Sequence, residues 1–414
     1  MSDVNVPVAL DQHDERIITS TGVPEALSML LGRIRGGDIG SLPVIVGLAL
    51  IWVVFQLLNP FFLSSANLTN LLLECAAVGT ISIGVVLILL VAQIDLSVGS
   101  MSGLSSAILG VGLTQHGWSV WTAMGAAVLA GVLVGILYGV IFVRFGVPSF
   151  VITLAGLLAL LGLQLQVLGT NGSINIPFDI WIVRFTQAMF VPRGLSYVLV
   201  AVVVAGWVGF RLARTQRRRR ANLSTRPMRG TLVIAVLALV LGEVAVWYLN
   251  LSRGVGASFV LFLGLLVVFD FALRRTRWGR AVYAVGGSVE AARRAGVNVT
   301  RIYLSVFILS STFAALGGLL AAGRLATASI SSGTGDTNLN AIAAAVIGGT
   351  SLFGGRGHVY SALLGVLTIS SISSGLTLLS LDSSIRFIIT GGVLMLAVIA
   401  DFLARKSREA HGRA

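Results

Sequence analysis

The sequence has few residues that react or ionise. Of its 414 residues one is cysteine, four are histidine and 11% are charged, with 16 acidic residues against 29 basic ones. The single cysteine, Cys75, excludes an intrachain disulfide and a cysteine-based metal site. The histidines lack the spacing of metal ligands, and they are His13, His116, His358 and His411. We therefore expect no metal, no cofactor and no catalytic residue in this chain.

The low charge also excludes a water-soluble fold, because soluble domains carry about 25% charged residues. Instead, 56% of the residues are hydrophobic and the mean hydropathy is +0.94. Long apolar runs recur along the chain, for example at residues 44–58, 81–92 and 231–241. Such runs predict several membrane-spanning helices, and the alternation typical of a membrane β-barrel is missing. We predict an all-α, polytopic transmembrane helical bundle.

The apolar pattern predicts about twelve spans (ten to twelve). They lie at residues 43–59, 71–92, 97–115, 117–143, 148–169, 194–210, 230–250, 256–273, 301–322, 338–351, 358–378 and 384–401. The tenth is too short to cross about 30 Å of hydrocarbon as a straight helix, so we expect a broken or re-entrant segment there. No short apolar segment with a cleavage site precedes the first span, so we expect no cleaved signal peptide.

The arginines and lysines lie mainly on one side of this predicted topology. With the N-terminus inside, 24 of the 29 fall on the cytoplasmic side. This distribution predicts an even number of spans and both termini in the cytoplasm. It also accounts for the net charge of +13 without nucleic-acid binding. The predicted parts are an N-terminal segment (1–42), a membrane domain (43–401) with cytoplasmic loops at 211–229 and 274–300, and a basic tail (402–414).

The first of those loops contains four successive arginines, Arg217–Arg220. We interpret them as a cytoplasmic anchor against anionic lipid. Regulation or docking of a partner is the alternative.

Carboxylates inside a membrane are costly and are functional candidates by default. Glu74 and Asp270 are predicted near span ends, where water solvates them, whereas Glu243 lies inside an apolar span. We interpret Glu243 as a structural carboxyl that is hydrogen-bonded to a neighbouring helix. A proton-coupled role is the alternative.

Glycines repeat every four residues in the fourth predicted span, at Gly131, Gly135 and Gly139. On a helix they form one smooth stripe, which predicts close packing of a second helix.

Two glycine- and serine-rich segments interrupt the apolar pattern. Residues 94–100 separate two spans with almost no loop, and there we expect Asp95 to accept hydrogen bonds from free N–H groups of the next helix. Residues 347–357 end the tenth span, and their five glycines favour tight, non-helical backbone. The candidate turn residues are Asp95, Ser97, Gly99, Gly348, Gly349, Thr350, Ser351, Gly354 and Gly355.

A third segment, residues 278–297, predicts a short amphipathic helix in a basic loop. Ser288 is a natural N-cap, and Gly296 ends the helix. Glu290 and Arg294 are four residues apart and can form an ion pair, while mainly alanines occupy the other face. This shape is suited to docking into a soluble partner. The candidate residues are Gly286, Gly287, Ser288, Glu290, Ala291, Ala292, Arg293, Arg294 and Gly296.

These three segments resemble the permease family of ABC importers for monosaccharides such as ribose, galactose and xylose. The similarity covers roughly residues 65–170 and 270–400, and the extra hairpin at 194–250 resembles the D-xylose branch. Asn338 and Asn340 stand where the family pattern has Glu and Asp. The resemblance places them at the mouth of the pathway, and the two amides argue against a charge-based role there.

The resemblance implies a bacterial inner-membrane permease whose partners are a cytoplasmic ATPase subunit, an extracytoplasmic sugar-binding protein and a second permease copy. ATP and Mg²⁺ would bind to the ATPase, since this sequence has no phosphate-binding loop and is not expected to be an enzyme. The helix around Glu290–Gly296 would couple ATPase motion to the membrane bundle.

The alternatives are an ABC permease for branched-chain amino acids, an ion-coupled secondary transporter and a membrane-embedded enzyme. The identity of the sugar stays open.

Overall fold

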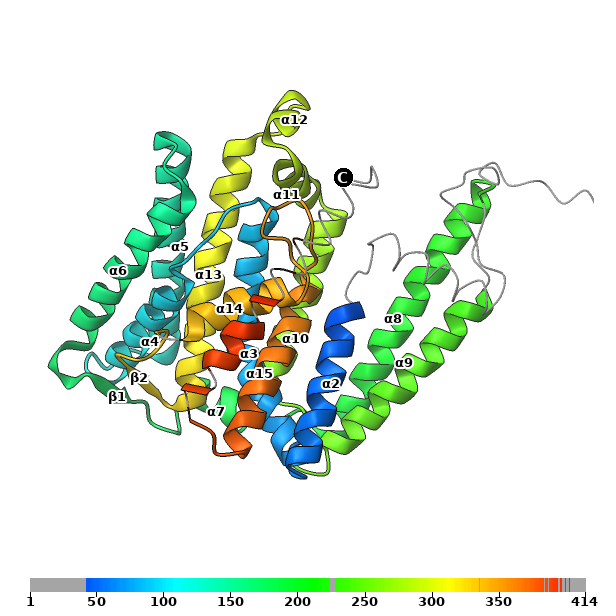
Figure 1. Ribbon diagram of the computed structural model, residues 1–414, viewed down its shortest axis with the longest axis horizontal. Helices are drawn as coiled ribbons and strands as arrows, with labels where there is room; N and C mark the ends of the chain where they lie inside the picture. The colour runs from blue at the N-terminus through cyan, green and yellow to red at the C-terminus, as the bar shows by residue number, and fades with distance from the viewer. Residues whose placement is uncertain are drawn as a thin grey trace, which may run out of the picture. The chain divides into compact units, whose positions relative to one another are not determined.

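The computed structural model describes residues 42–223, 228–334 and 336–382, and, further on, residues 384–385, 387–393, 395–396, 399 and 402 (Figure 1). These residues divide into two compact units, Val191–Val255 and the remainder of the described chain. The first unit is a hairpin of α8 (Arg193–Arg220) and α9 (Met228–Leu249).

The second unit contains the other helices. They are α2 (Leu42–Leu58), α3 (Ser65–Leu90), α4 (Val98–Thr114), α5 (Val120–Phe145), α6 (Ser149–Leu168), the 3-10 turn η2 (Gly169–Asn171), α7 (Trp181–Gln187), α10 (Ala257–Arg275), α11 (Arg277–Gly287), α12 (Val289–Arg294), α13 (Val299–Leu325), α14 (Asp336–Ile347) and α15 (Tyr360–Leu378).

The helices confirm a polytopic membrane protein, and the described residues contain fewer full spans than the twelve predicted. Within the described residues eight helices are long and apolar enough to cross a bilayer, and α2 and α4 are shorter apolar helices of 17 residues. Helix α14 has 12 residues and is about 18 Å long, so it cannot span by itself, as predicted for the tenth segment. The last predicted span, 384–401, lies partly outside the described residues.

Helix α13 is the centre of the second unit and packs against α3, α4 and α5 (Figure 1). Small side chains permit this packing, because α13 buries residues such as Ala314, Ala315, Gly317 and Gly318. In the most apolar 18-residue stretch of α3, 83% of the residues are buried, so protein surrounds this helix instead of lipid.

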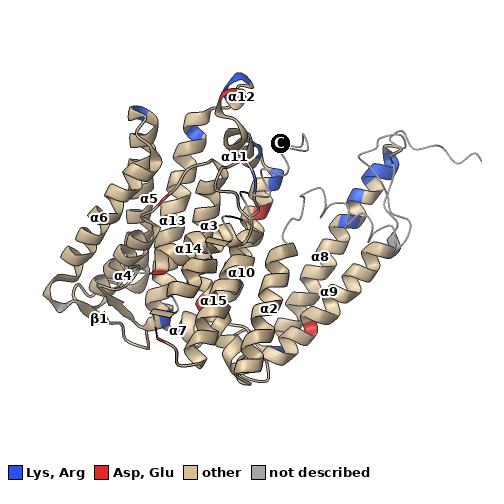
Figure 2. Ribbon diagram, viewed as in Figure 1, with Lys and Arg blue, Asp and Glu red and all other residues tan. Residues whose placement is uncertain are grey.

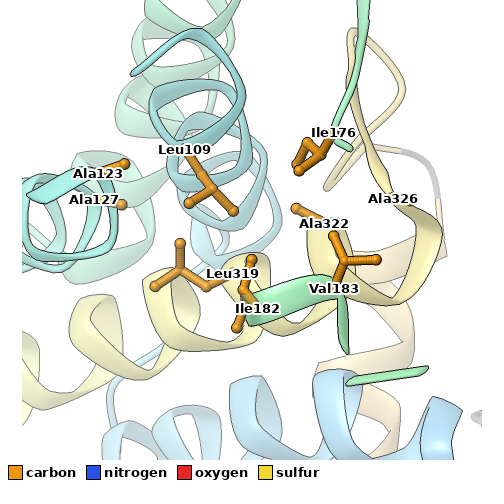
Figure 3. Packing of buried hydrophobic residues seen from close by; sticks show 9 residues of the cluster. All are labelled: Leu109, Ala123, Ala127, Ile176, Ile182, Val183, Leu319, Ala322 and Ala326. Atoms are coloured by element: carbon orange, nitrogen blue, oxygen red, sulfur yellow. The ribbon is translucent and has the colours of Figure 1, made fainter. Parts of the chain in front are cut away.

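A buried apolar cluster joins α4, α5, α7 and the end of α13. Figure 3 shows its side chains converging from these helices and from the segment before α7. They are Leu109, Ala123, Ala127, Ile176, Ile182, Val183, Leu319, Ala322 and Ala326. The cluster fixes the end of the bundle away from α11 and α12.

A small antiparallel sheet adds to the predicted all-α fold. Strand β1 (Ser173–Asn175) pairs with β2 (Thr327–Ser329), with Ile174 opposite Ala328. Sequence pattern did not indicate it, because three-residue strands carry too little alternation to be recognised. Helix α6 holds the end of β2 and the residues after it, since Gln164 Nε2 donates to the carbonyl oxygens of Ser329 and Ser332 at 2.9 Å.

The predicted basic loop at 211–229 is wrong in its first half, because α8 continues as a helix to Arg220. The Arg211 guanidinium lies 4.9 Å from the centre of the Trp207 ring, a cation–π contact that favours the helical continuation. Within this hairpin, Asn250 Nδ2 donates to Ser196 Oγ at 3.1 Å.

The predicted loop at 274–300 contains α12, the short helix that the sequence predicts, and also a second helix, α11. In the second unit Lys and Arg gather mainly at one end, around α12 and the ends of α10 and α13 (Figure 2). This arrangement agrees with the basic segments that the topology assigns to one side of the membrane.

The glycine stripe of α5 packs against α13, as the sequence predicts. A Cβ placed on Gly135 would lie 2.5 Å from Ile308 Cα, and one on Gly131 would lie 2.8 Å from the Ser311 carbonyl oxygen. The two backbones therefore approach more closely than any side chain allows.

We predict that Gly135→Leu lowers the melting temperature of the detergent-purified protein, because overpacking costs about 1–3 kcal/mol or more. The matched control is Gly125→Leu in the same helix, where a Cβ would meet nothing within 4 Å. Thermal unfolding of both variants beside the parent checks this. Equal melting temperatures for the two variants would contradict the packing.

Candidate functional site

Helix α11 begins at a side-chain cap that the sequence analysis did not identify. Thr276 Oγ1 accepts a hydrogen bond from Gly279 N at 3.1 Å, which satisfies one free N–H of the first turn. Val282 and Val285 are fully buried, whereas the opposite face carries Arg280 and Ala284 at the surface. Helix α11 is therefore an amphipathic helix seated on the bundle.

Helix α12 has the predicted caps at both ends. Ser288 Oγ accepts from Ala291 N at 3.2 Å. At the other end Gly296 has φ +79, its N–H donates to Arg293 O at 3.0 Å, and Val297 N donates to Ala292 O at 3.0 Å. This pair of bonds is the Schellman motif, in which glycine adopts the left-handed conformation at least cost.

The predicted ion pair on α12 is present, with Arg294 Nε 3.1 Å from Glu290 Oε1. Arg293 lies farther from the same carboxylate, at 3.9 Å. All three side chains are more than half exposed, so the pairs contribute little to stability. Their main consequence is a charged outer surface.

The alanine face of α12 is divided between the protein and solvent. Ala292 is 3% exposed and packs inside the permease, whereas Ala291 and Gly296 are exposed. Of the alanines at 291 and 292, only Ala291 is therefore free to contact a partner. A bulky residue at 292 would displace α12 before it could block docking.

The backbones of α11, α3 and the glycine loop (residues 348–357) meet at one point. Gly355 N donates to the carbonyl oxygen of Leu90 at 2.9 Å. A Cβ on Gly286 would overlap that same oxygen and would lie 2.6 Å from Gly355 N. The contact therefore requires glycine at position 286.

The glycine loop takes conformations that only glycine adopts readily. Gly354 and Gly355 have φ of +81 and +70, and Gly357 has φ +143. The loop is closed by Ser351 N, which donates to Arg356 O at 3.1 Å. Thr350 is buried, and its Oγ1 has no hydrogen-bond partner within the described part of the chain.

A side chain of α11 also holds the glycine loop. Tyr283 Oη donates to Gly357 O at 2.9 Å. Burial raises the pKa of Tyr283, so the hydroxyl keeps the proton that it donates here. Burial, followed by the Arg274 guanidinium, lowers the pKa of His358 next to the loop, which favours its neutral form.

Asp95 makes a contact that differs in part from the prediction. Its Oδ1 accepts from Ser97 N at 2.9 Å and from Ser97 Oγ at 2.7 Å, so it fixes the residue that precedes α4 and not the first turn of α4. Its Oδ2 accepts from Ser310 Oγ of α13 at 2.9 Å. The sequence could not reveal Ser310, which is 215 residues away.

The turn before α4 is also bound to α14. Asn338 Nδ2 donates to Leu96 O at 2.8 Å, and a Cβ on Gly99 would lie 2.5 Å from Gly333 O. Two of the three segments singled out in the sequence, residues 278–297 and 347–357, thus meet at Leu90. The third, residues 94–100, begins four residues after Leu90 and is held by α14 through Leu96. Asn340 lies apart from this turn, at a cavity between α14 and α15.

Comparisons with known proteins identify the family of the chain. A family model described as the permease component of the branched-chain amino acid transport system matches residues 67–398. The chain belongs to this permease family. It is accordingly a multi-pass permease component and not a catalytic subunit. No solved structure matches the chain.

Curated relatives extend over most of the chain. The xylose transport system permease protein XylH of Escherichia coli (strain K12) is 34% identical over 346 residues, which are 83% of this chain and 87% of that protein. XylH of Haemophilus influenzae is 32% identical over 366 residues, 88% of this chain and 96% of that protein. The ribose import permease protein RbsC of E. coli (strain K12) is 30% identical over 359 residues, which are 86% of this chain and 92% of that protein. These matches confirm the resemblance stated from the three segments.

The close approach at Gly286 supplies a matched pair of substitutions. We predict that Gly286→Ala lowers the melting temperature of the purified permease by several degrees, because its Cβ would overlap the Leu90 carbonyl at a cost of about 1–3 kcal/mol. Gly287→Ala is the control, since a Cβ at that neighbouring position meets nothing within 4 Å. If both variants melt with the parent, the backbones do not meet as described.

The membrane carboxylates have different surroundings. Asp270 pairs with Arg274 at 2.6 Å, and Glu74 is exposed. The sequence analysis predicts that Glu243 forms a hydrogen bond to a neighbouring helix. Its Oε2 atom is buried and has no hydrogen-bond partner among the described residues.

We predict that Glu243→Gln leaves ATP-dependent uptake within a few-fold of the parent, because an amide has nearly the same shape. Uptake by right-side-out vesicles, at equal amounts of assembled transporter, measures this. Loss of uptake with assembly intact would support ion coupling through this carboxyl.

Proposed function

We propose that this chain is the membrane-spanning permease subunit of an ATP-driven importer for a monosaccharide. D-Xylose is the expected substrate, and ribose or galactose is next. Support comes from relatives that are named xylose and ribose permeases and that align with at least 83% of the chain. An extracytoplasmic binding protein would deliver the sugar, and a separate ATPase with bound ATP and Mg²⁺ would drive transport.

The observation that carries this proposal is the way in which α12 is capped at both ends and attached to the bundle through α11. Its caps hold it as a short, rigid protrusion, and its outer surface presents Glu290, Ala291 and Arg294 to solvent. An ATPase that receives this helix in a groove would move α12 and α11 together. Because α11 is bound to α3 at Leu90 and to the glycine loop at Gly357, that motion would pass into the bundle.

A branched-chain amino acid importer is the second candidate, since the family model carries that description. The two candidates differ in what the binding protein recognises. Calorimetry of the cognate binding protein with D-xylose, ribose, galactose and leucine separates them.

The assembly and topology are part of the same proposal. We expect two permease copies in the bacterial inner membrane, an even number of spans in each, and both termini in the cytoplasm. The topology rests on the predominance of basic residues on one side. Its natural labelling positions, Ser224 and Ser407, lie outside the described residues.

We predict that Ala291→Trp abolishes co-purification of the ATPase and reduces sugar uptake by about tenfold or more, because a bulky ring on the exposed face of α12 blocks a close-fitting groove. The Gly296→Trp variant should have the same effect, with added backbone strain at φ +79. Co-purification and uptake by proteoliposomes containing the ATPase and binding protein are the two measurements.

The control for these variants is Gln115→Trp, an exposed residue at the far end of α4. It should behave like the parent in both assays. Normal ATPase binding by Ala291→Trp would remove α12 from the interface and, with it, the main support for this mechanism.

A further inference from the structure

A cavity of about 210 Å³ lies between α14, α15 and residues 387–391. It is lined by Asp336, Leu339, Asn340, Ala343, Ile369, Ser373, Phe387, Thr390 and Gly391. Drug-sized ligands occupy pockets of roughly 300–1,000 Å³, so this volume suits a smaller molecule. The cavity is separate from the contacts around α11 and α12.

The polar side chains that line this cavity have no hydrogen-bond partner among the described residues. Asp336, Asn340, Ser373 and Thr390 offer a carboxylate, an amide and two hydroxyls, and within the described residues these side chains make no hydrogen bond or ion pair with protein. A carboxylate only accepts hydrogen bonds, whereas an amide and a hydroxyl both donate and accept. Together they match the mixed donor and acceptor character of several adjacent hydroxyl groups.

The charge of the lining discriminates between ligand classes. None of the nine lining residues is Lys, Arg or His. An amino acid would bring an α-carboxylate that finds no positive charge among these nine residues and meets the Asp336 carboxylate instead. A neutral polyhydroxylated molecule has no such penalty, and Leu339, Ile369 and Phe387 provide apolar surface for its carbon skeleton.

One short helix, α14, connects this cavity to the glycine loop and to the turn before α4. Helix α14 carries Asp336, Asn340 and Ala343 at the cavity, and its C-terminal end leads into the glycine loop that binds Leu90. Between them Asn338 donates to Leu96 O. A shift of the glycine loop would therefore displace the residues at the cavity.

We propose that this cavity is a binding station for the neutral sugar on its way through the permease, with Asp336 and Asn340 as the main hydroxyl ligands and Ser373 and Thr390 completing the site. This rests on the proposed function, whose substrate it makes more specific. Asn340, one of the two asparagines predicted at the pathway mouth, contacts the sugar, while Asn338 holds the neighbouring turn.

The test uses the full transporter with its ATPase and binding protein in proteoliposomes, and radiolabelled D-xylose, ribose and galactose as probes. Ser373→Phe fills the cavity and should reduce uptake of the transported sugar by about tenfold or more, with ATPase co-purification and melting temperature unchanged. Thr377→Phe, one turn along α15 and exposed, is the control and should stay within about twofold of the parent.

A second pair of variants preserves the shape of the cavity. Asp336→Asn should raise the KM for uptake about fivefold or more, since hydrogen bonds to a charged group are stronger than those to an amide. Asp382→Asn, an exposed carboxylate after α15, should leave the KM unchanged. If Ser373→Phe fails to assemble, the KM values of this second pair of variants test whether the cavity binds the sugar.

The outcomes separate the two proposals. A parent transporter that takes up none of the three sugars overturns the proposed function and this site with it. A parent that transports sugar, with Ser373→Phe or Asp336→Asn equally active, overturns only the cavity assignment.

Discussion

The backbone contact between Leu90, Gly286 and Gly355 is the constraint on which the rest of the site depends. Three segments, of which α3 and the glycine loop lie more than 250 residues apart in sequence, converge where Gly355 N donates to the Leu90 carbonyl and Gly286 leaves no room for a Cβ. Closely packed backbones cannot slide past one another without losing the hydrogen bond and the fit. The end of α3, α11 and the glycine loop therefore behave as one body.

This body lies between the exposed helix and the core. On one side α12 continues directly from α11 through the cap residue Ser288. On the other side α3 packs against α13, and Asp95 binds Ser310 of the same helix. The irregular segments keep their backbone groups paired through such contacts, which non-helical chain within a membrane protein requires. The same contacts transmit movement.

The amino-acid sequence predicts local features of this fold well. Positions of helices follow from apolar runs, the caps of α12 follow from Ser288 and Gly296, and the packing of α5 follows from its glycine stripe. It does not predict the end of α8 beyond residue 210, where polar residues continue the helix, or the partner of Asp95. Those depend on contacts between distant segments, and Gly286 gives no local sign that Leu90 is its neighbour. The cavity could not be predicted from the sequence for the same reason, because its walls come from α14, α15 and residues 387–391, which only the fold brings together.

Hydrogen exchange of the glycine loop tests the central claim most directly. A segment with four glycines between residues 348 and 355 would exchange its amide protons within seconds if it were a free loop, because nothing in its side chains shields them. Mass spectrometry of the intact permease in nanodiscs should instead show peptides covering residues 351–357 protected to the same extent as the end of α3, with Gly286→Ala removing the protection of both. Rapid exchange of this loop in the parent, beside a protected α3, would contradict the account.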